Sequence, residues 1–312
     1  MKILVTGGAG FIGSHIAEAL VKNKQDVRIL DNFSTGKIEN IKHFENKIDL
    51  IEGTITDKTT VDDAVRGCDY IFHEAAFVSV EESIKNPVKT WDVNIRGTLL
   101  ILAAASRMGI KRVVLASSAA VYGDTLALPK REDGSLAPKS PYGESKHINE
   151  MNAEKYFKDF KLQTVCLRYF NVYGPRQDPN SPYSGVISKF VSAAMKKAQP
   201  VIYGDGEQTR DFVYVKDVVR ANLFAMSERK AVGQVFNIGT GKETSINQLW
   251  KEIKKQTKSK HIPIHKEPRD GDIRRSFASI VKAGKILKYK PQYSLEDGLK
   301  DTIEWIKQTH PR

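Results

Sequence analysis

Residues 2–23 read "KILVTGGAGFIGSHIAEALVKN": a short apolar run, a cluster of glycines, and a stretch whose apolar residues recur at helical spacing. Gly8, Gly10 and Gly13 form a G-x-G-x-x-G pattern, and Gly7 begins an overlapping G-x-x-G-x-x-G pattern. Glycines between a strand and a helix let the backbone approach a pyrophosphate at the positive N-terminus of the helix. The stretch therefore predicts a unit that binds a dinucleotide.

An acidic residue follows at the position that such a unit requires. Asp31 ends the next apolar run, about 20 residues after the glycines. Its carboxylate can bond a ribose 2′-hydroxyl and would repel a 2′-phosphate. We therefore expect the cofactor to be NAD rather than NADP.

The first half of the chain alternates short β-branched runs with helical patterns. The strand-like runs after the first are "DVRILDN" (26–32), "IDLIEG" (48–53), "CDYIFHEAA" (68–76) and "KRVVLASSAAVYG" (111–123). Strands that alternate with helices are typical of parallel β-α-β units. We expect an α/β fold of the Rossmann type, with a doubly wound parallel sheet covered by helices on both faces.

The alternation weakens after "GPRQDPNSPYSG" (174–185), where the Pro, Gly and Asn content rises. Two later stretches, "DFVYVKDV" (211–218) and "GQVFNIGTG" (233–241), again look like strands of the sheet. The shift predicts an NAD-binding domain of residues 1–175 with 213–240. A second, smaller substrate-binding domain is predicted from 176–212 with 241–312.

The composition excludes several classes of protein. With 312 residues, 40% hydrophobic and 28% charged, the chain is typical of a globular protein. No apolar run approaches the roughly 18 residues that a membrane span needs, and the N-terminal apolar segment lacks a signal-peptide cleavage pattern. We expect a cytoplasmic protein. Cys68 and Cys166 are too few for a disulfide framework, and Pro263 between His261 and His265 argues against a helical metal site. No metal is expected.

The net charge of +12 is compatible with nucleic-acid binding, but the pattern of the basic residues is not. Residues 251–266 and 282–290 hold the densest lysines, with apolar residues at helical intervals between them. Nucleic-acid surfaces interleave aromatic residues with the charges, and here Trp250 lies just outside the first segment. We read these segments as solvated helix faces and expect no nucleic acid and no membrane partner.

Residues 140–146, "SPYGESK", are the second informative stretch. Ser140 suits a helix N-cap and Pro141 the first helical position. On such a helix Tyr142 and Lys146 lie one turn apart on the same face. A surface contact would explain that spacing equally well, so it gains meaning only from the dinucleotide unit beside it.

Together these stretches resemble the extended short-chain dehydrogenase/reductases, within the NAD-dependent epimerases and dehydratases and in particular the UDP-galactose 4-epimerase group. The similarity covers nearly the whole chain. The motifs occur in the family's order: "TGGAGFIG", "HEAAFVSVEESIKNP", "DVNIRGT", "SSAAVYG", "SPYGESK", "RYFNVYGPRQDP", "YGDGEQTRDFVYVKDV" and "PRDGDIRRSFA".

The resemblance implies a catalytic set of Ser118, Tyr142 and Lys146. It implies that Tyr142 takes a proton from a sugar hydroxyl while hydride leaves the same carbon for NAD. A free tyrosine has a pKa of about 10, so we expect Lys146 and the oxidised nicotinamide to favour the phenolate. The 4-ketosugar then turns over and the hydride returns to its other face, which regenerates NAD.

The resemblance also implies two sets of binding residues. Those expected at the cofactor are Gly7, Gly10, Phe11, Ile12, Gly13, Asp31, Asn32, Ile55, Ala75, Ala76 and Asn94, with Tyr142 and Lys146. Those expected at a UDP-sugar are Ser79, Asn171, Val186, Tyr203, Arg210, Arg269, Asp272 and Ser276, with Ser118 and Tyr142.

Several positions depart from the family's pattern. Thr54 stands where an Asp usually contacts the adenine, Ser279 replaces another Asp, and Ala116 replaces a frequent Ser. The 4,6-dehydratases of the family carry an Asp-Glu pair directly after the catalytic Ser/Thr, where this chain has Ala119 and Ala120. A methyl group transfers no proton, so dehydration is disfavoured.

The sugar itself is indicated by one small residue. In the family's epimerases the position of Ser276 faces the sugar, where a Tyr narrows the pocket and a small residue admits an N-acetyl group. We therefore expect UDP-N-acetylglucosamine and its galacto epimer, with UDP-glucose and UDP-galactose as further substrates. The alternatives are UDP-glucuronate 4-epimerisation, another modification of a nucleotide sugar, or an NAD-binding protein without turnover.

The family's dimers also imply a partner. Helices expected near 92–108 and 142–159 carry broad apolar content. We expect them to pair across a two-fold axis in a homodimer, although burial within one chain would explain the same pattern.

Overall fold

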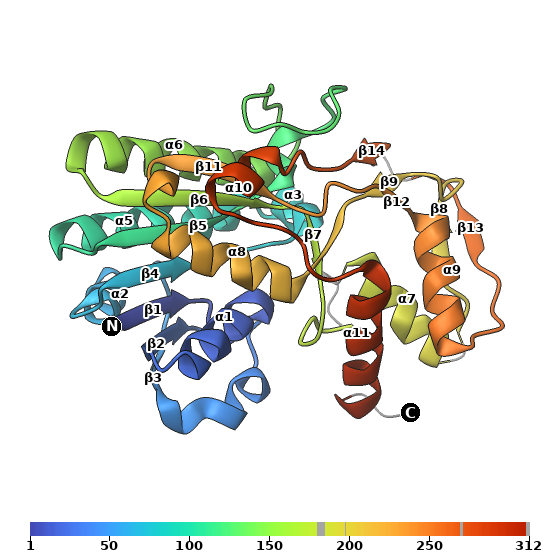
Figure 1. Cartoon of the computed structure of the whole chain (residues 1–312), viewed down its shortest axis with the longest axis horizontal. Helices are drawn as coiled ribbons and strands as arrows, with labels where there is room; N and C mark the ends of the chain where they lie inside the picture. Colours follow the sequence, from blue (N-terminus) through green and yellow to red (C-terminus); the bar gives the residue numbers. More distant parts are fainter. Residues whose placement is uncertain (180–184, 197, 269–270, 310–312) are drawn as a thin grey trace.

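The computed structural model describes residues 1–179, 185–196, 198–268 and 271–309. Its largest sheet has seven parallel strands in the order β11-β6-β5-β4-β1-β2-β3 (Figure 1). The strands are β1 (Lys2–Thr6), β2 (Asp26–Asp31), β3 (Ile48–Glu52), β4 (Tyr70–His73), β5 (Arg112–Ser118), β6 (Gln163–Tyr169) and β11 (Gln234–Ile238). The predicted doubly wound α/β fold is confirmed.

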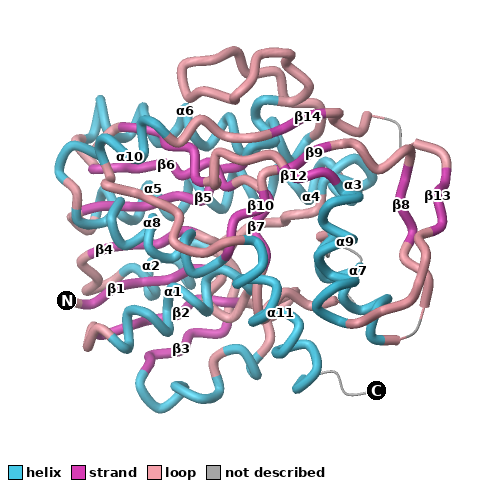
Figure 2. The backbone as a smooth tube through the Cα atoms, turned by 45° about the vertical axis from the view of Figure 1, so that its right-hand side comes forward, coloured by secondary structure: helices cyan, strands magenta, loops and turns pink. Residues whose placement is uncertain are grey.

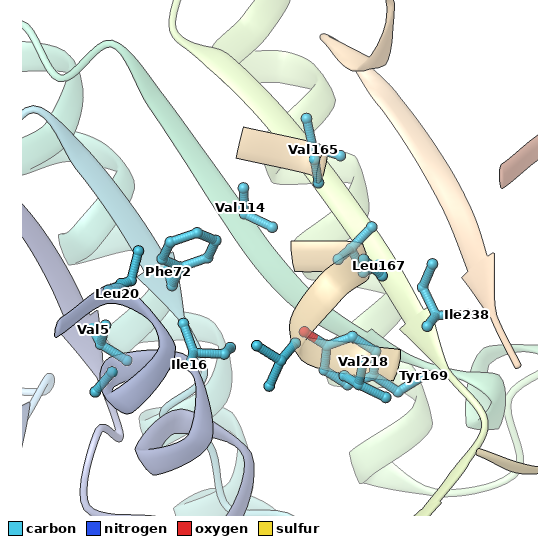
Figure 3. Packing of buried hydrophobic residues seen from close by; sticks show 14 of the residues in the cluster. Val5, Ile16, Leu20, Phe72, Val114, Val165, Leu167, Tyr169, Val218 and Ile238 are labelled. Atoms are coloured by element: carbon cyan, nitrogen blue, oxygen red, sulfur yellow. The ribbon is translucent and has the colours of Figure 1, made fainter. Parts of the chain in front are cut away.

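Helices cover both faces of this sheet. One face carries α1 (Phe11–Lys22), α8 (Val215–Ser227) and α10 (Val281–Ile286), and the other carries α2 (Lys58–Val65), α5 (Gly97–Arg107) and α6 (Pro141–Phe160). Neighbouring residues of a strand face opposite sides, so Val5 packs with the α1 side (Figure 3) and Leu4 with the α2 side. Burial on both faces explains why the strands read as continuous apolar runs.

The order of the strands places a crevice at their carboxyl ends. The chain runs from β1 outward to β2 and β3, and then returns to β4 on the other side of β1. Ligands of doubly wound sheets bind where the order reverses, outside the carboxyl ends of the strands. The loops after β1 and β4 meet there, because the Glu74 N–H donates to the Thr6 carbonyl at 3.2 Å.

The remaining elements lie beyond this edge of the sheet (Figures 1 and 2). Helices α7 (Val186–Met195), α9 (Ile246–Thr257) and α11 (Leu295–Thr309) share a third apolar cluster around Phe190, Trp250 and Ile303. Small sheets accompany them: β12 (Thr244–Ser245) with β9 (Thr209–Arg210) and β14 (Arg275–Ser276), β8 (Val201–Tyr203) with β13 (Ile264–Lys266), and β7 (Asn171–Tyr173) with β10 (Phe212–Tyr214). The division of the chain into two domains stays our proposal.

Short helices complete the described chain. They are α3 (Val80–Lys85), α4 (Pro87–Trp91), a π-helical turn (Asp92–Arg96) and 3₁₀ turns at Ile38–Asn40, Lys42–Lys47, Ala119–Tyr122 and Arg229–Ala231. The helix expected over 92–108 is thus a π turn followed by α5, and the helix expected over 142–159 is α6.

A buried carboxylate joins the β14 segment to the loop after β11. Asp211 is fully buried and accepts four hydrogen bonds: from the Thr240 N–H (2.7 Å) and hydroxyl (2.6 Å), and from the N–H groups of Gly241 (2.9 Å) and Ala278 (3.1 Å). Burial raises the pKa of this carboxyl, and the four donors oppose that rise. Asp211 therefore positions the strand that carries Ser276.

Asp211→Asn should lower the free energy of unfolding by about 2–4 kcal/mol, because its amide nitrogen would face two buried donors and leave them unpaired. Urea unfolding followed by circular dichroism measures this. Asp205→Asn is the matched control, since Asp205 binds Arg274 of the same segment in an exposed ion pair worth about 0–1 kcal/mol. Equal losses in the two variants would contradict the role of Asp211.

Candidate active site

The glycine loop between β1 and α1 leaves no room for a side chain at Gly7 or at Gly13. Gly7 has a φ of 69°, and a Cβ there would lie 2.8 Å from the Ala75 nitrogen. A Cβ at Gly13 would overlap the Gly7 carbonyl. Gly10 is the N-cap of α1 and makes no side-chain capping bond, so the first-turn N–H groups of the helix stay open to a ligand. This cradle fits the pyrophosphate of NAD.

Asp31 is buried at the end of β2, beside this loop. Its two oxygens accept hydrogen bonds from the N–H groups of Ala9 (2.9 Å) and Phe33 (2.8 Å). Burial raises the pKa of Asp31, and these bonds counter the rise. A carboxylate has about four acceptor sites, so the side chain that shapes the loop can still bond a ribose hydroxyl.

Tyr142 and Lys146 are positioned by the start of α6. Ser140 is the N-cap, and its hydroxyl accepts a hydrogen bond from the Gly143 N–H at 3.1 Å, with Pro141 at the first helical position. The Lys146 Nζ donates to the Ala116 carbonyl of β5 at 2.9 Å and lies 5.8 Å from the centre of the Tyr142 ring. The capping motif thus aims both side chains at the end of β5.

Ser118 ends β5 and reaches the same point. Its hydroxyl is hydrogen-bonded to Tyr142 and accepts from the Ala120 N–H at 3.1 Å. The structure therefore brings the three predicted catalytic residues together, at the carboxyl edge where the strand order reverses.

Burial dominates the electrostatics of this set. It raises the pKa of Tyr142 above its ordinary value, the Ser118 hydrogen bond opposes the rise, and the charge of Glu74 adds to it. Burial also lowers the pKa of Lys146 to about 8, against the opposing charge of Glu74. The expectation of a lowered tyrosine pKa is therefore not met in the protein alone. Without cofactor, Tyr142 is a neutral phenol at neutral pH.

Gly143 permits the contact between α6 and the catalytic strand. A Cβ at this position would lie 2.9 Å from the Ala120 carbonyl oxygen, two residues after Ser118. Any larger residue would push the first turn of α6 away from β5. Gly143 belongs to "SPYGESK", and a glycine inside the first turn of a helix, which costs about 1 kcal/mol relative to Ala, is the sequence signal of this close contact.

The side chain of Asn94 is used in hydrogen bonds to other residues of the protein. Its Oδ1 accepts from the Phe77 N–H at 2.7 Å, and its Nδ2 donates to the Phe77 carbonyl (3.1 Å) and the Ser145 hydroxyl (3.0 Å). Both amide hydrogens are used, and the residue sits in the π turn, a distortion frequent at functional sites. Asn94 therefore joins the β4 loop to α6, and a direct contact with NAD stays a proposal.

The other predicted cofactor residues line the same edge. Phe11 and Ile12 open α1, Asn32 follows β2, Ala75 and Ala76 follow β4, and buried Ile55 contacts Gly97 of α5. Thr54, the departure beside Ile55, shares a hydrogen bond with Thr56 at 2.9 Å. The roles of these residues at NAD stay proposals.

The predicted substrate residues are divided among several elements. Arg210 of β9 binds Asp272 and donates to the Ile273 carbonyl at 2.6 Å, and Ser276 of β14 is its register partner. Asn171 lies in β7, Val186 begins α7, Tyr203 ends β8, and Ser79 caps α3 by accepting from the Glu82 N–H at 3.0 Å. Arg269 lies outside the described residues. Their contacts with a UDP-sugar stay proposals.

The chain was compared with known families and structures. The model of the NAD dependent epimerase/dehydratase family matches residues 3–239. The chain belongs to this family. It is an enzyme, and its cofactor is NAD.

Relatives similar over their whole length carry the comparison further. A protein of Methanocaldococcus jannaschii described as a putative UDP-glucose 4-epimerase is 42% identical over 311 residues, or 99% of each chain. The UDP-glucose 4-epimerase of Thermotoga maritima with UDP-glucose has a TM-score of 0.95 and 40% identity, covering 99% of each chain. The UDP-N-acetylglucosamine 4-epimerase of Methanobrevibacter ruminantium with UDP-N-acetylmuramic acid has a TM-score of 0.94 and 38% identity, covering 98% of each chain.

Within residues 1–179, 185–196, 198–268 and 271–309, no three His, Cys, Asp or Glu side chains are grouped so that they could hold a metal ion. In the same ranges, no helix has both the length and the apolar character that crossing a bilayer requires.

Gly143→Ala should lower kcat/KM about 10- to 100-fold while the protein stays folded, because the added methyl displaces Tyr142 from Ser118 and a shift of about 1 Å can cost that much. Steady-state kinetics with bound NAD confirmed by absorbance test this. Glu144→Ala changes the neighbouring exposed residue and should leave kcat/KM within about twofold. Full activity of Gly143→Ala would show that the close contact does not matter.

Proposed function

We propose that this enzyme interconverts the C4 epimers of a UDP-hexose through a transient 4-ketosugar. The observation that carries the proposal is the meeting of Ser118, Tyr142 and Lys146 beside a glycine cradle for NAD. When bound, NAD accepts the hydride from the sugar and returns it, so no second substrate is needed.

The chain's own groups divide the remaining work. As the phenolate, Tyr142 takes the proton of the C4 hydroxyl and later gives it back, which is general base and then general acid catalysis. The Ser118 hydroxyl bonds the Tyr142 oxygen and can bond the sugar oxygen as well. Lys146, a buried ammonium 5.8 Å from the centre of the Tyr142 ring, favours the phenolate that this step requires.

The residues after Ser118 favour epimerisation over elimination of water. Ala119 and Ala120 form the 3₁₀ turn that follows β5, and neither side chain can transfer a proton. An elimination needs an added acid and base at the sugar. Return of the hydride to the 4-ketosugar needs no acid or base beyond Tyr142.

A neutral sugar fits the charges better than a hexuronate. The described arginines of this region each bind a carboxylate of the chain: Arg176 with Glu18, Arg210 with Asp272, Arg274 with Asp205, and Arg275 with Glu243. Among these four arginines, a hexuronate carboxylate would meet no guanidinium group that is without a carboxylate partner. Ser276 is small, which supports UDP-N-acetylglucosamine and UDP-N-acetylgalactosamine, with UDP-glucose and UDP-galactose as further substrates.

Incubation with UDP-N-acetylglucosamine, UDP-glucose or UDP-glucuronate, without added NAD, should give the galacto epimer of the first and, more slowly, of the second. Proton NMR of the anomeric signals identifies the products. Conversion of UDP-glucuronate alone, to its epimer or with loss of carbon dioxide, would overturn the neutral-sugar assignment. Turnover of none by protein with confirmed NAD would overturn the proposed function.

Tyr142→Phe should lower kcat about 10²- to 10⁴-fold, the range for loss of a general base. The amount of NAD bound to the protein should not change. Tyr156→Phe on the same helix is the control and should keep kcat within about twofold. Retention of full activity by Tyr142→Phe would contradict the mechanism.

We also propose that two copies of this chain associate through α3, α4 and α6. These helices expose apolar side chains that a monomer would leave in water: Ile84 (62%), Val88 (74%), Trp91 (44%) and Met151 (56%). Helix α6 supplies the Met151 part of this surface, and the predicted partner helix α5 leaves Leu99 and Leu100 half-buried in the monomer. The proposed contact therefore adds α3 and α4 to the predicted pair of helices.

Val88→Lys should shift the protein from dimer to monomer in size-exclusion chromatography with light scattering, because a charge in an apolar interface is left unpaired. Val281→Lys changes a less exposed but still exposed valine (61%) on α10, outside the proposed dimer surface, and should not alter the mass. A monomeric wild type would end the proposal.

A further inference from the structure

Glu74 is a carboxyl group at the active site to which neither the family pattern nor the proposed mechanism gives a role. It follows β4 directly, between His73 and Ala75, at the point where the strand order reverses. Its carboxyl accepts a hydrogen bond from the Tyr169 hydroxyl at 2.9 Å. A carboxyl here is expensive to bury unless it is bonded or paired.

The contacts of Asn222 fix the direction of the hydrogen bond between Tyr169 and Glu74. The Asn222 Nδ2 lies 2.9 Å from the Val218 carbonyl, which cannot donate, so this atom must be the amide nitrogen. Its second hydrogen points at the Tyr169 oxygen, 2.8 Å away. The Tyr169 proton is then directed to Glu74. Figure 3 shows Tyr169 beside Val218 in the apolar cluster that fixes both.

Glu74 also lies beside the strand that holds Lys146. His73 is the register partner of Leu115, so Glu74 continues next to Ala116. Tyr169, which binds the Glu74 carboxyl, is the register partner of Ser118. Lys146 is a nearly buried ammonium (5% exposed) whose Nζ donates to the Ala116 carbonyl. A carbonyl bond alone does not balance a buried charge, which otherwise loses its proton. Of the carboxyl groups that act on Lys146, Glu150 acts less strongly than Glu74 and is already bound by Arg168 at 2.7 Å.

We propose that Glu74 is a positioning residue for the proposed epimerase reaction: its carboxylate, held by the Tyr169 hydroxyl, keeps Lys146 protonated beside the phenol of Tyr142. The proposal rests on the proposed function for the roles of Tyr142 and Lys146. It goes beyond that function by naming the group that maintains the charge of Lys146.

The titratable groups around Glu74 agree with this role. Burial raises the pKa of Glu74 to about 7, against the Tyr169 hydrogen bond and the charge of Lys146. The charge of Glu74 in turn raises the pKa values of Lys146 and Tyr142. Glu74 and Lys146 thus each favour the charged form of the other.

The other titratable groups near the pair contribute no opposing charge. His73 is buried, and burial lowers its pKa to about 3, so the imidazole is neutral at neutral pH. Burial raises the pKa values of the Cys166 thiol and the Tyr169 phenol, so both keep their protons. Glu74 is therefore the charge whose removal should matter to Lys146.

Removal of a negative charge lowers the pKa of neighbouring groups, so Glu74→Gln should lower the pKa of Lys146. In Glu74→Gln the pKa of Lys146 should fall by about one unit, the lower end for an opposite charge at short range. The amide keeps an acceptor oxygen for Tyr169. Because the pKa of Glu74 is about 7, wild type and variant should agree well below pH 7 and diverge above it.

The experiment follows the ¹³Cε signals of labelled lysine by NMR against pH, in the full chain with bound NAD and without sugar. The Lys146 signal is assigned by its absence in Lys146→Arg. We expect its midpoint to move about one pH unit lower in Glu74→Gln and to stay in place in Glu154→Gln, an exposed carboxyl on the same helix. With a UDP-sugar, the alkaline limb of kcat should move by the same amount.

Tyr169→Phe is the second variant, which removes the hydroxyl and keeps the ring. It should move the Lys146 midpoint in the same direction by less, because Glu74 loses the bond that favours its charged form. If Glu74→Gln does not fold, the Lys146 midpoint in Tyr169→Phe tests the proposal. An unmoved Lys146 midpoint overturns the proposal even if activity falls. Since the titration contains no sugar, it stands whether or not the chain turns over any UDP-sugar.

Discussion

The burial of the Lys146 ammonium is the constraint on which the site depends. A cation removed from water must be met by acceptors and counter-charges within a few ångströms, and here they come from different elements. Ala116 of β5 supplies a carbonyl at 2.9 Å, and the charge of Glu74, at the end of β4, raises the pKa of the ammonium. The ammonium therefore holds α6 against β5 at the edge where the cofactor binds.

Contacts outside the catalytic side chains place α6 beside β5. The cap at Ser140 sets where α6 begins, and Gly143 lets its first turn approach the Ala120 carbonyl. Below them, Asn94 in the π turn bonds Phe77 and Ser145 and so joins the β4 loop to α6. These contacts use backbone groups and short polar side chains.

Much of this could be predicted from the sequence, because the fold and the catalytic set depend on local patterns. The glycine spacing, the alternation of strands and helices, and the "SPYGESK" motif are each contiguous. Glu74, Tyr169 and Asn222 lie far apart in the sequence and meet only because β4, β6 and α8 pack together. The partners of Asp211 are likewise distant. The raised pKa of Tyr142 was missed because it depends on the depth of burial.

The segment that carries Ser276 is separate from the elements that carry Tyr142 and Ser118. Segment 272–278 is bound at Arg210 by Asp272, at Asp205 by Arg274, at Glu243 by Arg275, and at Asp211 by the Ala278 N–H. With so many anchors on either side, we expect a substitution at Ser276 to leave in place the strand that carries it and to alter only the volume of the sugar site that we propose there. The proposed catalytic residues lie on other elements, β5 and α6, which the hydrogen bond between Lys146 and the Ala116 carbonyl joins. Under the proposed function, substrate choice can therefore change by substitution at one strand while the proton and hydride chemistry stays in place.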